Sequence, residues 1–363
     1  MNKNTIIACS TPYTVLNAVN YCIGTHDENV DIFISAFSPS VKEIAVRIKD
    51  IGLFNEVYEV KDIRRLKFFS IFLLLSFIFP SYVMKHIGMK QMKEKKYSKI
   101  ISQNFLFISL LSKIGRKADC YLIEEGLSTY AGRARIPQGH SRLKLLYRNF
   151  FREKFNPKVK GIYVYSPQMM YKQNDYEILE LPAFNPSKSE MYNRIFGFKN
   201  NKLFIQNRII FVGAPDMIMR KCSINETQMN EYEFFSNYIH PLIVSESIIF
   251  RPHPAEKGYS DFLKLPIDTY NNQWELECFH NLKDDNVIVN YFSTTAATPK
   301  ILFGKEPYII FLYHLSDYGD ELVRKYDEFV ERLLTLYKDK NKVIVIRDVD
   351  GLSKIPMIIN NIY

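Results

Sequence analysis

Asp216 and His253 are the two side chains of this sequence best placed to move a proton. Asp216 ends the element Gly213-Ala-Pro-Asp216, and His253 stands between two prolines in Arg251-Pro-His-Pro254. Each follows a short apolar run that Gly or Pro cuts off, which is typical of a buried strand and too short for a helix. A carboxylate and an imidazole are the usual groups that exchange a proton with a hydroxyl. The pair therefore predicts acid–base chemistry just past two strand carboxyl ends, where open α/β sheets bind ligands.

Three consecutive hydroxyl side chains end another apolar run, in Phe292-Ser-Thr-Thr295. The small residues that follow favour a helix, so we expect Ser293, Thr294 or Thr295 to cap it. The free N–H groups and the positive dipole end of a helix N-terminus attract an anion such as phosphate. A plain helix cap without a ligand is the alternative. The same reasoning applies, with less support, to Ser10 after the first apolar run.

The acidic pair Glu124 and Glu125, followed by Gly126, ends a further apolar run. Gly126 permits a tight turn and the close approach of a ligand, and paired carboxylates in a cleft shift each other's pKa. The pair is therefore a candidate binding element, although its spacing alone is weakly specific. The alternative is a solvated acidic turn.

The only tryptophan, Trp274, is followed by Glu275 and, two residues later, by Glu277. A carboxylate accepts hydrogen bonds from the amino group of cytosine or from ribose hydroxyls, so we expect Glu275 to contact a nucleotide. Packing of Trp274 in the core, with both glutamates solvated, is the alternative.

Apolar, β-branched runs separated by helical stretches recur along the chain, and this rhythm predicts parallel βαβ units. It breaks into Pro, Asn and Ser at residues 181–188 and restarts at Leu203. We therefore expect an α/β protein of two Rossmann-like domains, residues 1–190 and 191–363, with the junction near residues 182–202. The predicted strands are residues 5–9, 30–36, 57–60, 99–102, 120–124, 161–165, 209–212, 247–251, 287–291, 308–312 and 343–347.

Composition narrows the class of protein. With 363 residues, of which 47% are hydrophobic and 24% charged, the chain is long enough for two cores and is not a disordered protein. The five cysteines are scattered, without the spacing of a disulfide framework or a zinc site, which fits a reducing cytoplasm. The first apolar run is too brief for a signal peptide. The histidines other than His253 lack its framing and are expected to be surface or packing residues.

The net charge of +9 is concentrated where aromatic residues are dense. Residues 68–84 are nearly apolar, and residues 141–155 form a basic amphipathic pattern that carries Arg142, Lys144, Arg148, Arg152 and Lys154. Together they predict a cytoplasmic protein attached peripherally to the anionic inner face of the plasma membrane. A buried helix and a solvated helix face are the alternative. No nucleic-acid-binding signature accompanies the basic residues.

Taken in order, these motifs resemble the bacterial sialyltransferases of glycosyltransferase family 52, which act on lipooligosaccharide and capsule. The motifs are Glu124-Glu-Gly126, Gly213-Ala-Pro-Asp216, His253-Pro254 and Phe292-Ser-Thr-Thr295. The resemblance covers most of residues 99–313. It implies the GT-B fold, in which two Rossmann-like domains face a central cleft. The N-terminal domain would then lie on the acceptor side and the C-terminal domain would bind the CMP-sugar donor.

Carried onto this chain, the family's roles make Asp216 the catalytic base. They bring His253 and Pro254 to the donor phosphate, near Ser293 and Thr294. Other bacterial sialyltransferase families take their base from the acidic pair, so Glu125 is the rival base. This chain has Glu where Asp is common in those families. No N-terminal membrane anchor, present in some members, is expected.

The resemblance implies transfer of sialic acid from CMP-sialic acid, with inversion, to a terminal galactose of a bacterial surface glycan, in α2,3 linkage. No cofactor and no metal would be needed, because hydrogen bonds from His253 and from the helix start at residues 293–295 would stabilise the phosphate charge. The sequence leaves open whether the protein forms a homodimer.

Two other functions stay open at this point. Family 52 also includes α-glucosyltransferases, so the donor could be another sugar nucleotide such as a UDP-hexose. A non-enzymatic module that binds a sugar nucleotide or a membrane is the second alternative, and it would tolerate the loss of Asp216.

Overall fold

The computed structural model describes residues 4–25, 29–35, 39–60, 95–103, 105–112, 118–126, 129–130, 158–170, 176–224, 226–243, 248–253, 258–269 and 272–362. Within these ranges the chain divides into two units, which are described separately. Residues 4–129 and 158–198 belong to the first unit, and Tyr130 and residues 199–362 belong to the second.

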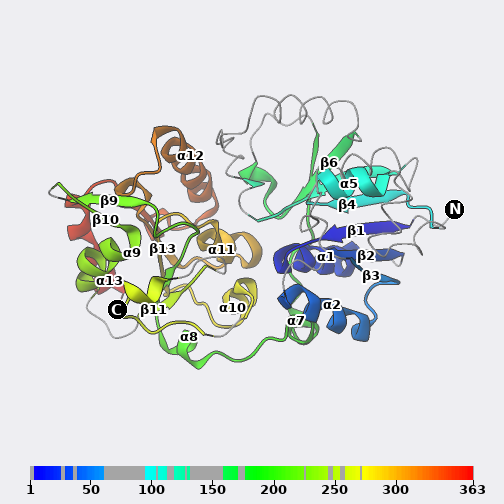
Figure 1. Cartoon of the computed structure of the whole chain (residues 1–363), viewed down its shortest axis with the longest axis horizontal. Helices are drawn as coiled ribbons and strands as arrows, with labels where there is room; N and C mark the ends of the chain where they lie inside the picture. Colours follow the sequence, from blue (N-terminus) through cyan, green and yellow to red (C-terminus); the bar gives the residue numbers. More distant parts are fainter. Residues whose placement is uncertain are drawn as a thin grey trace. The chain divides into compact units, whose positions relative to one another are not determined.

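The first unit is built on one parallel sheet with the strand order β3-β2-β1-β4-β5-β6-β7 (Figure 1). The chain runs from β1 outward to β3 and then from β4 outward to β7, so the direction of winding switches between β1 and β4. All residues of β1 and β2 are buried, as expected for a parallel sheet covered on both faces. The strands are β1 (Thr5–Cys9), β2 (Val30–Ser35), β3 (Val57–Val60), β4 (Lys99–Ser102), β5 (Asp119–Ile123), β6 (Val159–Val164) and β7 (Glu177–Glu180).

The described helices of the first unit are α1 (Pro12–Thr25), α2 (Pro39–Ile51), α5 (Phe105–Ser112) and α7 (Ser189–Phe196). Helix α7 contacts α2 and ends at Gly197, whose φ of 65° is the left-handed conformation that closes a helix. The domain boundary predicted between residues 190 and 191 therefore falls inside α7. This helix packs on α2 and still belongs to the first unit, which extends to Phe198.

The second unit is built on a parallel sheet with the order β11-β8-β12-β13-β14, and its winding switches between β8 and β12. An antiparallel hairpin of β9 and β10 follows β8. The strands are β8 (Ile209–Val212), β9 (Lys221–Ile224), β10 (Thr227–Asn230), β11 (Ile248–Arg251), β12 (Val287–Asn290), β13 (Tyr308–Phe311) and β14 (Val343–Val345). The helices are α8 (Lys202–Gln206), α9 (Glu231–Phe234), α10 (Trp274–His280), α11 (Thr298–Phe303), α12 (Asp320–Leu336) and α13 (Lys354–Ile362).

The prediction of an α/β protein with two Rossmann-like domains is confirmed. Every predicted strand is present, within two residues of its expected bounds. Strands β7, β9 and β10 were not predicted, since their sequences are polar or mixed and give no apolar run. The turn of the β9–β10 hairpin contains Glu226, with a φ of 65°.

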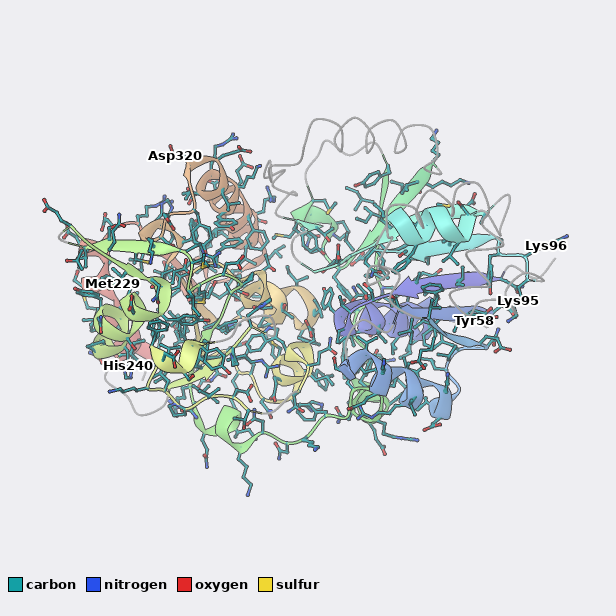
Figure 2. The ribbon with its side chains drawn as sticks, in the orientation of Figure 1. Tyr58, Lys95, Lys96, Met229, His240 and Asp320 are labelled. Carbon is teal, nitrogen blue, oxygen red and sulfur yellow. The ribbon has the colours of Figure 1, made fainter. Side chains whose placement is uncertain are left out.

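A partly buried cluster of polar side chains lies at the amino-terminal edge of the first sheet. Asp31 accepts hydrogen bonds from Lys95 Nζ at 2.9 Å and from Tyr97 Oη at 2.7 Å. Lys95 also lies 5.8 Å from the ring centre of Tyr58, and Figure 2 shows the two side chains next to each other. These charges satisfy one another at the edge opposite the strand carboxyl ends, so their role is structural.

None of the helices within the described ranges is long and apolar enough to cross a bilayer. Residues 68–84 and the basic positions Arg142, Lys144, Arg148, Arg152 and Lys154, on which the prediction of membrane contact rests, lie outside those ranges.

Candidate functional site

Three of the predicted elements leave the same edge of the second sheet. Strand β8 is hydrogen-bonded to β11 on one side and to β12 on the other, all in parallel. Asp216 follows β8, His253 follows β11 and Ser293 follows β12. The gap between β8 and β12 is where the winding switches, and ligands bind at such points in open α/β sheets. The carboxyl edge of this sheet is therefore the candidate site.

Gly213 lets the loop after β8 lie directly against the backbone of His253. Its N–H donates to the carbonyl of Arg251 at 2.9 Å. A Cβ atom placed on Gly213 would be 2.9 Å from the backbone nitrogen of His253, closer than real Cβ contacts allow. The absence of a side chain at this position is what permits the two candidate elements to meet.

Asp216 is exposed and has an unusual backbone conformation, with a φ of 64°. The N–H groups of Met219 and Arg220 donate to its carbonyl at 3.0 and 3.2 Å, which closes a tight turn around it. Asp tolerates the left-handed region better than most residues. Backbone strain of this kind concentrates at functional sites, where the surrounding structure holds it in place.

The hydroxyl run after β12 begins a 3-10 turn, Thr294–Ala297, that continues into α11. As predicted, Ser293 stands at the N-cap position of this turn, but its side chain makes no capping hydrogen bond. Ser293 Oγ instead shares a hydrogen bond of 2.5 Å with Thr295 Oγ1, and the N–H of Ser293 donates to Asn290 Oδ1 at 2.7 Å. Asn290, the last residue of β12, therefore fixes the loop, and the hydroxyls of Ser293 and Thr295 pair with each other.

Phe292 anchors this loop in the core. It is 7% exposed and stacks on Tyr326 of α12 with the ring centres 3.4 Å apart. Tyr313 meets the same ring edge-on, at 5.6 Å. Phe292 thus holds the hydroxyl run against α12, which is a packing role.

Trp274 and Glu275 begin helix α10, which lies beside the hydroxyl run. Trp274 Nε1 donates to the carbonyl of Thr295 at 2.9 Å, and the Arg251 guanidinium lies 5.7 Å from the indole centre. Glu275 is 7% exposed and Glu277 is fully buried, so the alternative of solvated glutamates is wrong. Burial raises the pKa of Glu275, although its own backbone N–H, the side chain of Gln273 and the charge of Arg251 oppose the shift.

Glu275→Gln should make the folded chain more stable at about pH 7 than the native sequence, with the difference vanishing below the unfolded pKa of about 4.3. The folded pKa of Glu275 is raised, so stability is lost as pH rises from the unfolded value through the folded one. Glutamine cannot ionise and escapes this loss. Melting temperatures across this range, with exposed Glu331→Gln as the control, test it. A lower melting temperature for Glu275→Gln at neutral pH would contradict the expectation.

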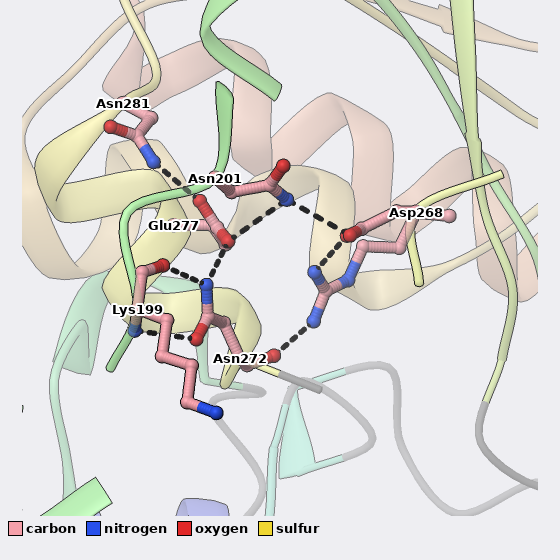
Figure 3. Close-up of polar contacts among 7 residues, drawn as sticks. Lys199, Asn201, Asp268, Asn272, Glu277 and Asn281 are labelled. Atoms are coloured by element: carbon pink, nitrogen blue, oxygen red, sulfur yellow. Dashed lines mark hydrogen bonds and ion pairs between the residues drawn. The ribbon is translucent and has the colours of Figure 1, made fainter. Parts of the chain in front are cut away.

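Glu277 is held by three amide donors in a network that the sequence did not reveal (Figure 3). Its Oε1 accepts from Asn272 at 2.6 Å and from Asn201 at 3.3 Å, and its Oε2 accepts from Asn281 at 2.6 Å. The side-chain amide of Asn272 also exchanges two hydrogen bonds with the backbone N–H and carbonyl of Lys199, which begins the main segment of the second unit. The network therefore ties the start of this segment to α10.

The acidic pair of the first unit has two different environments. Glu124 is fully buried, accepting from Tyr13 Oη at 2.5 Å and from the N–H of Tyr165 at 3.0 Å. Glu125 is exposed, and Gly126, at a φ of 115°, has open space where a side chain would be. The reading of a solvated acidic turn is wrong for Glu124 and fits Glu125.

Ser10 is buried at the carboxyl end of β1. Its hydroxyl donates to the side-chain oxygen of Gln103 at 2.6 Å, in the amide orientation that also lets Gln103 donate to Ala8. The hydroxyl is thus used within the first unit. Pro254 lies outside the described residues.

His314 is a polar residue that the sequence reading assigned to surface or packing. It follows β13 at the carboxyl edge of the second sheet, with Nε2 at 3.0 Å from Asp327 and 3.2 Å from Arg347. Tyr313 Oη also donates to Asp327 at 2.7 Å. Burial would raise the pKa of Asp327, but the hydrogen bonds from Tyr313 and His314 outweigh it and hold that pKa below its usual value. Asp327 and Arg347 lie 13 and 33 residues from His314, so no local sequence motif indicates this cluster.

Among the described residues, no three His, Cys, Asp or Glu side chains gather as metal ligands. The five cysteines are all free and buried.

No protein-family model matches this sequence, and no curated protein is similar to it. Solved structures do resemble it. UGT89C1 of Arabidopsis thaliana, complexed with UDP, is 12% identical, with the similarity spanning 99% of this chain and 90% of that chain and a TM-score of 0.50. A UDP-glucose: anthocyanidin 3-O-glucosyltransferase in complex with UDP is 10% identical over 99% and 95% of the two chains, with a TM-score of 0.49. Together with the two parallel sheets, the first of these likenesses shows that the chain has the GT-B fold.

Proposed function

We propose that this chain is an inverting glycosyltransferase that moves sialic acid from CMP-sialic acid to a terminal galactose of a bacterial surface glycan, in α2,3 linkage. The observation that carries the proposal is the arrangement at the carboxyl edge of the second sheet. There Asp216 and His253 leave adjacent parallel strands, next to the point where the winding switches. This is the order of motifs in which the sequence resembles the sialyltransferases of family 52.

In the proposed reaction, Asp216 is the general base. The acceptor hydroxyl attacks the anomeric carbon of sialic acid from the face opposite CMP, the bond from that carbon to the phosphate oxygen breaks, and the hydroxyl proton passes to the Asp216 carboxylate. General base catalysis of this kind contributes about 10²- to 10⁴-fold in rate. The exposure of Asp216 is consistent with contact to an acceptor.

His253 and the hydroxyl run would stabilise the departing phosphate. Negative charge develops on the phosphate oxygens as the bond to the sugar breaks, and hydrogen-bond donors fixed in advance stabilise it without reorganisation. The backbone of His253 is held against Gly213, and Ser293 and Thr295 are fixed through Asn290 and Trp274. These are rigid supports of the kind that such stabilisation requires.

A UDP-sugar is the second candidate donor. It is favoured by the similar solved structures named above, which are complexes with UDP. A UDP-hexose enzyme could use the same base and the same phosphate-binding elements, so the two candidates differ in the base of the nucleotide.

Donor identity is tested by thermal shift and calorimetry with CMP, UDP and GDP, followed by turnover with the matching sugar nucleotides. A nucleotide at about 100 times its dissociation constant should add about 2.7 kcal/mol of stability. The sialyltransferase proposal expects this shift with CMP and not with UDP or GDP. A shift with UDP alone would replace it by the UDP-sugar proposal, and none with any nucleotide would contradict both.

His253→Ala should weaken the binding of CMP by about 10- to 150-fold, since a hydrogen bond to a charged group is worth about 1.5–3 kcal/mol. Turnover should fall further, because the contact strengthens as charge develops on the phosphate. Calorimetry and kinetics measure the two effects. His240→Ala is the matched control, since His240 lies on the turn His240–Leu242 and follows no strand of the sheet. Unchanged CMP affinity in His253→Ala would place the phosphate elsewhere.

A further inference from the structure

Arg220 holds the loop that carries Asp216 from both sides of that residue. Its Nη2 donates to the carbonyl of Pro215, and its backbone N–H donates to the carbonyl of Asp216 at 3.2 Å. These two carbonyls belong to the two peptide units that flank the Asp216 Cα. Arg220 therefore fixes both of these peptide groups, and it thereby fixes the left-handed conformation of Asp216.

The guanidinium of Arg220 is itself held in place. Its Nε donates to Glu231 Oε1 at 2.9 Å, and its central carbon lies 4.7 Å from the ring centre of Tyr318. Glu231 is fully buried, and the same oxygen accepts from Ser316 Oγ at 2.6 Å. Burial raises the pKa of Glu231, and the charge of Arg220 opposes the shift.

Glu231 also contacts the segment between β12 and the hydroxyl run. Its carbonyl accepts from Tyr291 Oη at 2.9 Å, and Tyr291 comes two residues before Ser293. Its N–H donates to the carbonyl of Met217 at 3.3 Å, in the Asp216 loop. One residue therefore joins the loops that follow β8 and β12.

The β9–β10 hairpin brings Glu231 to this position. The hairpin leaves the Asp216 loop at Lys221 and returns at Asn230, where Asn230 and Glu233 form reciprocal side-chain to backbone hydrogen bonds that start α9. A buried ion pair is a poor way to stabilise a fold, because desolvation of the two charges offsets most of their attraction. Its directional hydrogen bonds, in contrast, define one orientation of the groups it holds.

We propose that Arg220 and Glu231 are positioning residues, which hold the Asp216 carboxylate in the orientation needed for proton transfer. The inference rests on the proposed function, in which Asp216 is the base. Neither side chain needs to touch the substrate, because both act through the backbone of Asp216.

Arg220→Lys tests the inference. Lysine keeps the charge but lacks the planar fork that reaches Glu231 and the Pro215 carbonyl together. Turnover should fall about 10- to 100-fold, since a misplacement of about 1 Å at a reacting group costs about that much. The affinity for CMP should stay within about twofold. Arg324→Lys is the matched control, because Arg324 is exposed and pairs loosely with Glu328 on α12, at 3.7 Å.

A double variant separates positioning from a general structural role. If Arg220 acts through Asp216, adding Arg220→Lys to Asp216→Asn should lower turnover no further, because the base is already absent. Independent effects that multiply would overturn the inference. Wild-type turnover in Asp216→Asn alone would instead contradict the proposed role of Asp216, so the two failures are distinguishable.

Glu231→Gln provides the second variant if Arg220→Lys does not fold, as judged by thermal melting. Glutamine keeps the volume and can still accept from Ser316, but it removes the charge that orients Arg220. Turnover should again fall at least about tenfold with CMP affinity retained. Full turnover in whichever of these variants folds would show that the ion pair does not position Asp216.

Discussion

Asp216→Asn should lower turnover by about 10²- to 10⁴-fold while leaving the affinity for CMP within about twofold of the native value. The amide has the shape of the carboxylate but cannot accept the proton of an acceptor hydroxyl. Loss of turnover without loss of donor affinity is the pattern expected when an interaction made only in the transition state is removed. Steady-state kinetics with CMP-sialic acid and a galactose-terminated acceptor, together with calorimetry, measure both quantities.

The matched control is Asp285→Asn, the same change at an exposed carboxylate of the same unit. Asp285 lies just before β12, at the opposite edge of the sheet, so its variant should turn over normally. Turnover of Asp216→Asn within about threefold of native would remove Asp216 as the base, since general base catalysis is worth far more than that. Glu125→Gln would then test the rival base.

Arg251→Met should destabilise the second unit by about 3–5 kcal/mol, the usual cost of leaving one partner of a buried ion pair alone. Arg251 Nη1 pairs with Asp268, whose side chain is 1% exposed, and Nη2 donates to the carbonyl of Asn272. Methionine fills much of the same volume but removes the charge that pairs with the Asp268 carboxylate, to which the side-chain amide of Asn201 still donates. Chemical denaturation followed by circular dichroism measures the loss.

Two further variants serve as controls for this measurement. Arg324→Met removes an exposed pair and should cost less than about 1 kcal/mol. Arg251→Met combined with Asp268→Leu removes both charges, so it should recover much of the lost stability. A cost below about 1 kcal/mol for Arg251→Met alone would mean that Asp268 remains solvated despite its position.

The strands that carry Asp216 and His253 were predictable because each is a short, apolar, β-branched run that ends at Gly or Pro. Parallel pairing then follows from the helices between them, and it brings Asp216 and His253 to one edge. The β9–β10 hairpin gave no such signal. Its residues are polar, and its position depends on contacts such as Lys221 with Asp317, which lie far apart in sequence.

Side-chain environments were much harder to predict than strands. Glu124 and Glu125 are adjacent, yet one is fully buried because Tyr13, 111 residues away, donates to it. Glu277 is buried because its amide donors come from Asn201, Asn272 and Asn281, which converge only in the folded chain. The residues next to a carboxylate in the sequence do not show which distant donors it will meet. The sequence therefore does not predict whether a carboxylate beside a candidate motif is buried and structural or exposed.

The hydrogen bond from Trp274 to the carbonyl of Thr295 gives the chain an optical probe of the proposed donor site. Trp274 is the only indole in the sequence, and its N–H ends on the hydroxyl run that is proposed to meet the phosphate. Its fluorescence should therefore change when a nucleotide alters that loop, with no second tryptophan to obscure the signal. Binding could then be followed in real time on the unlabelled protein, and the order in which donor and acceptor arrive could be read from a stopped-flow trace.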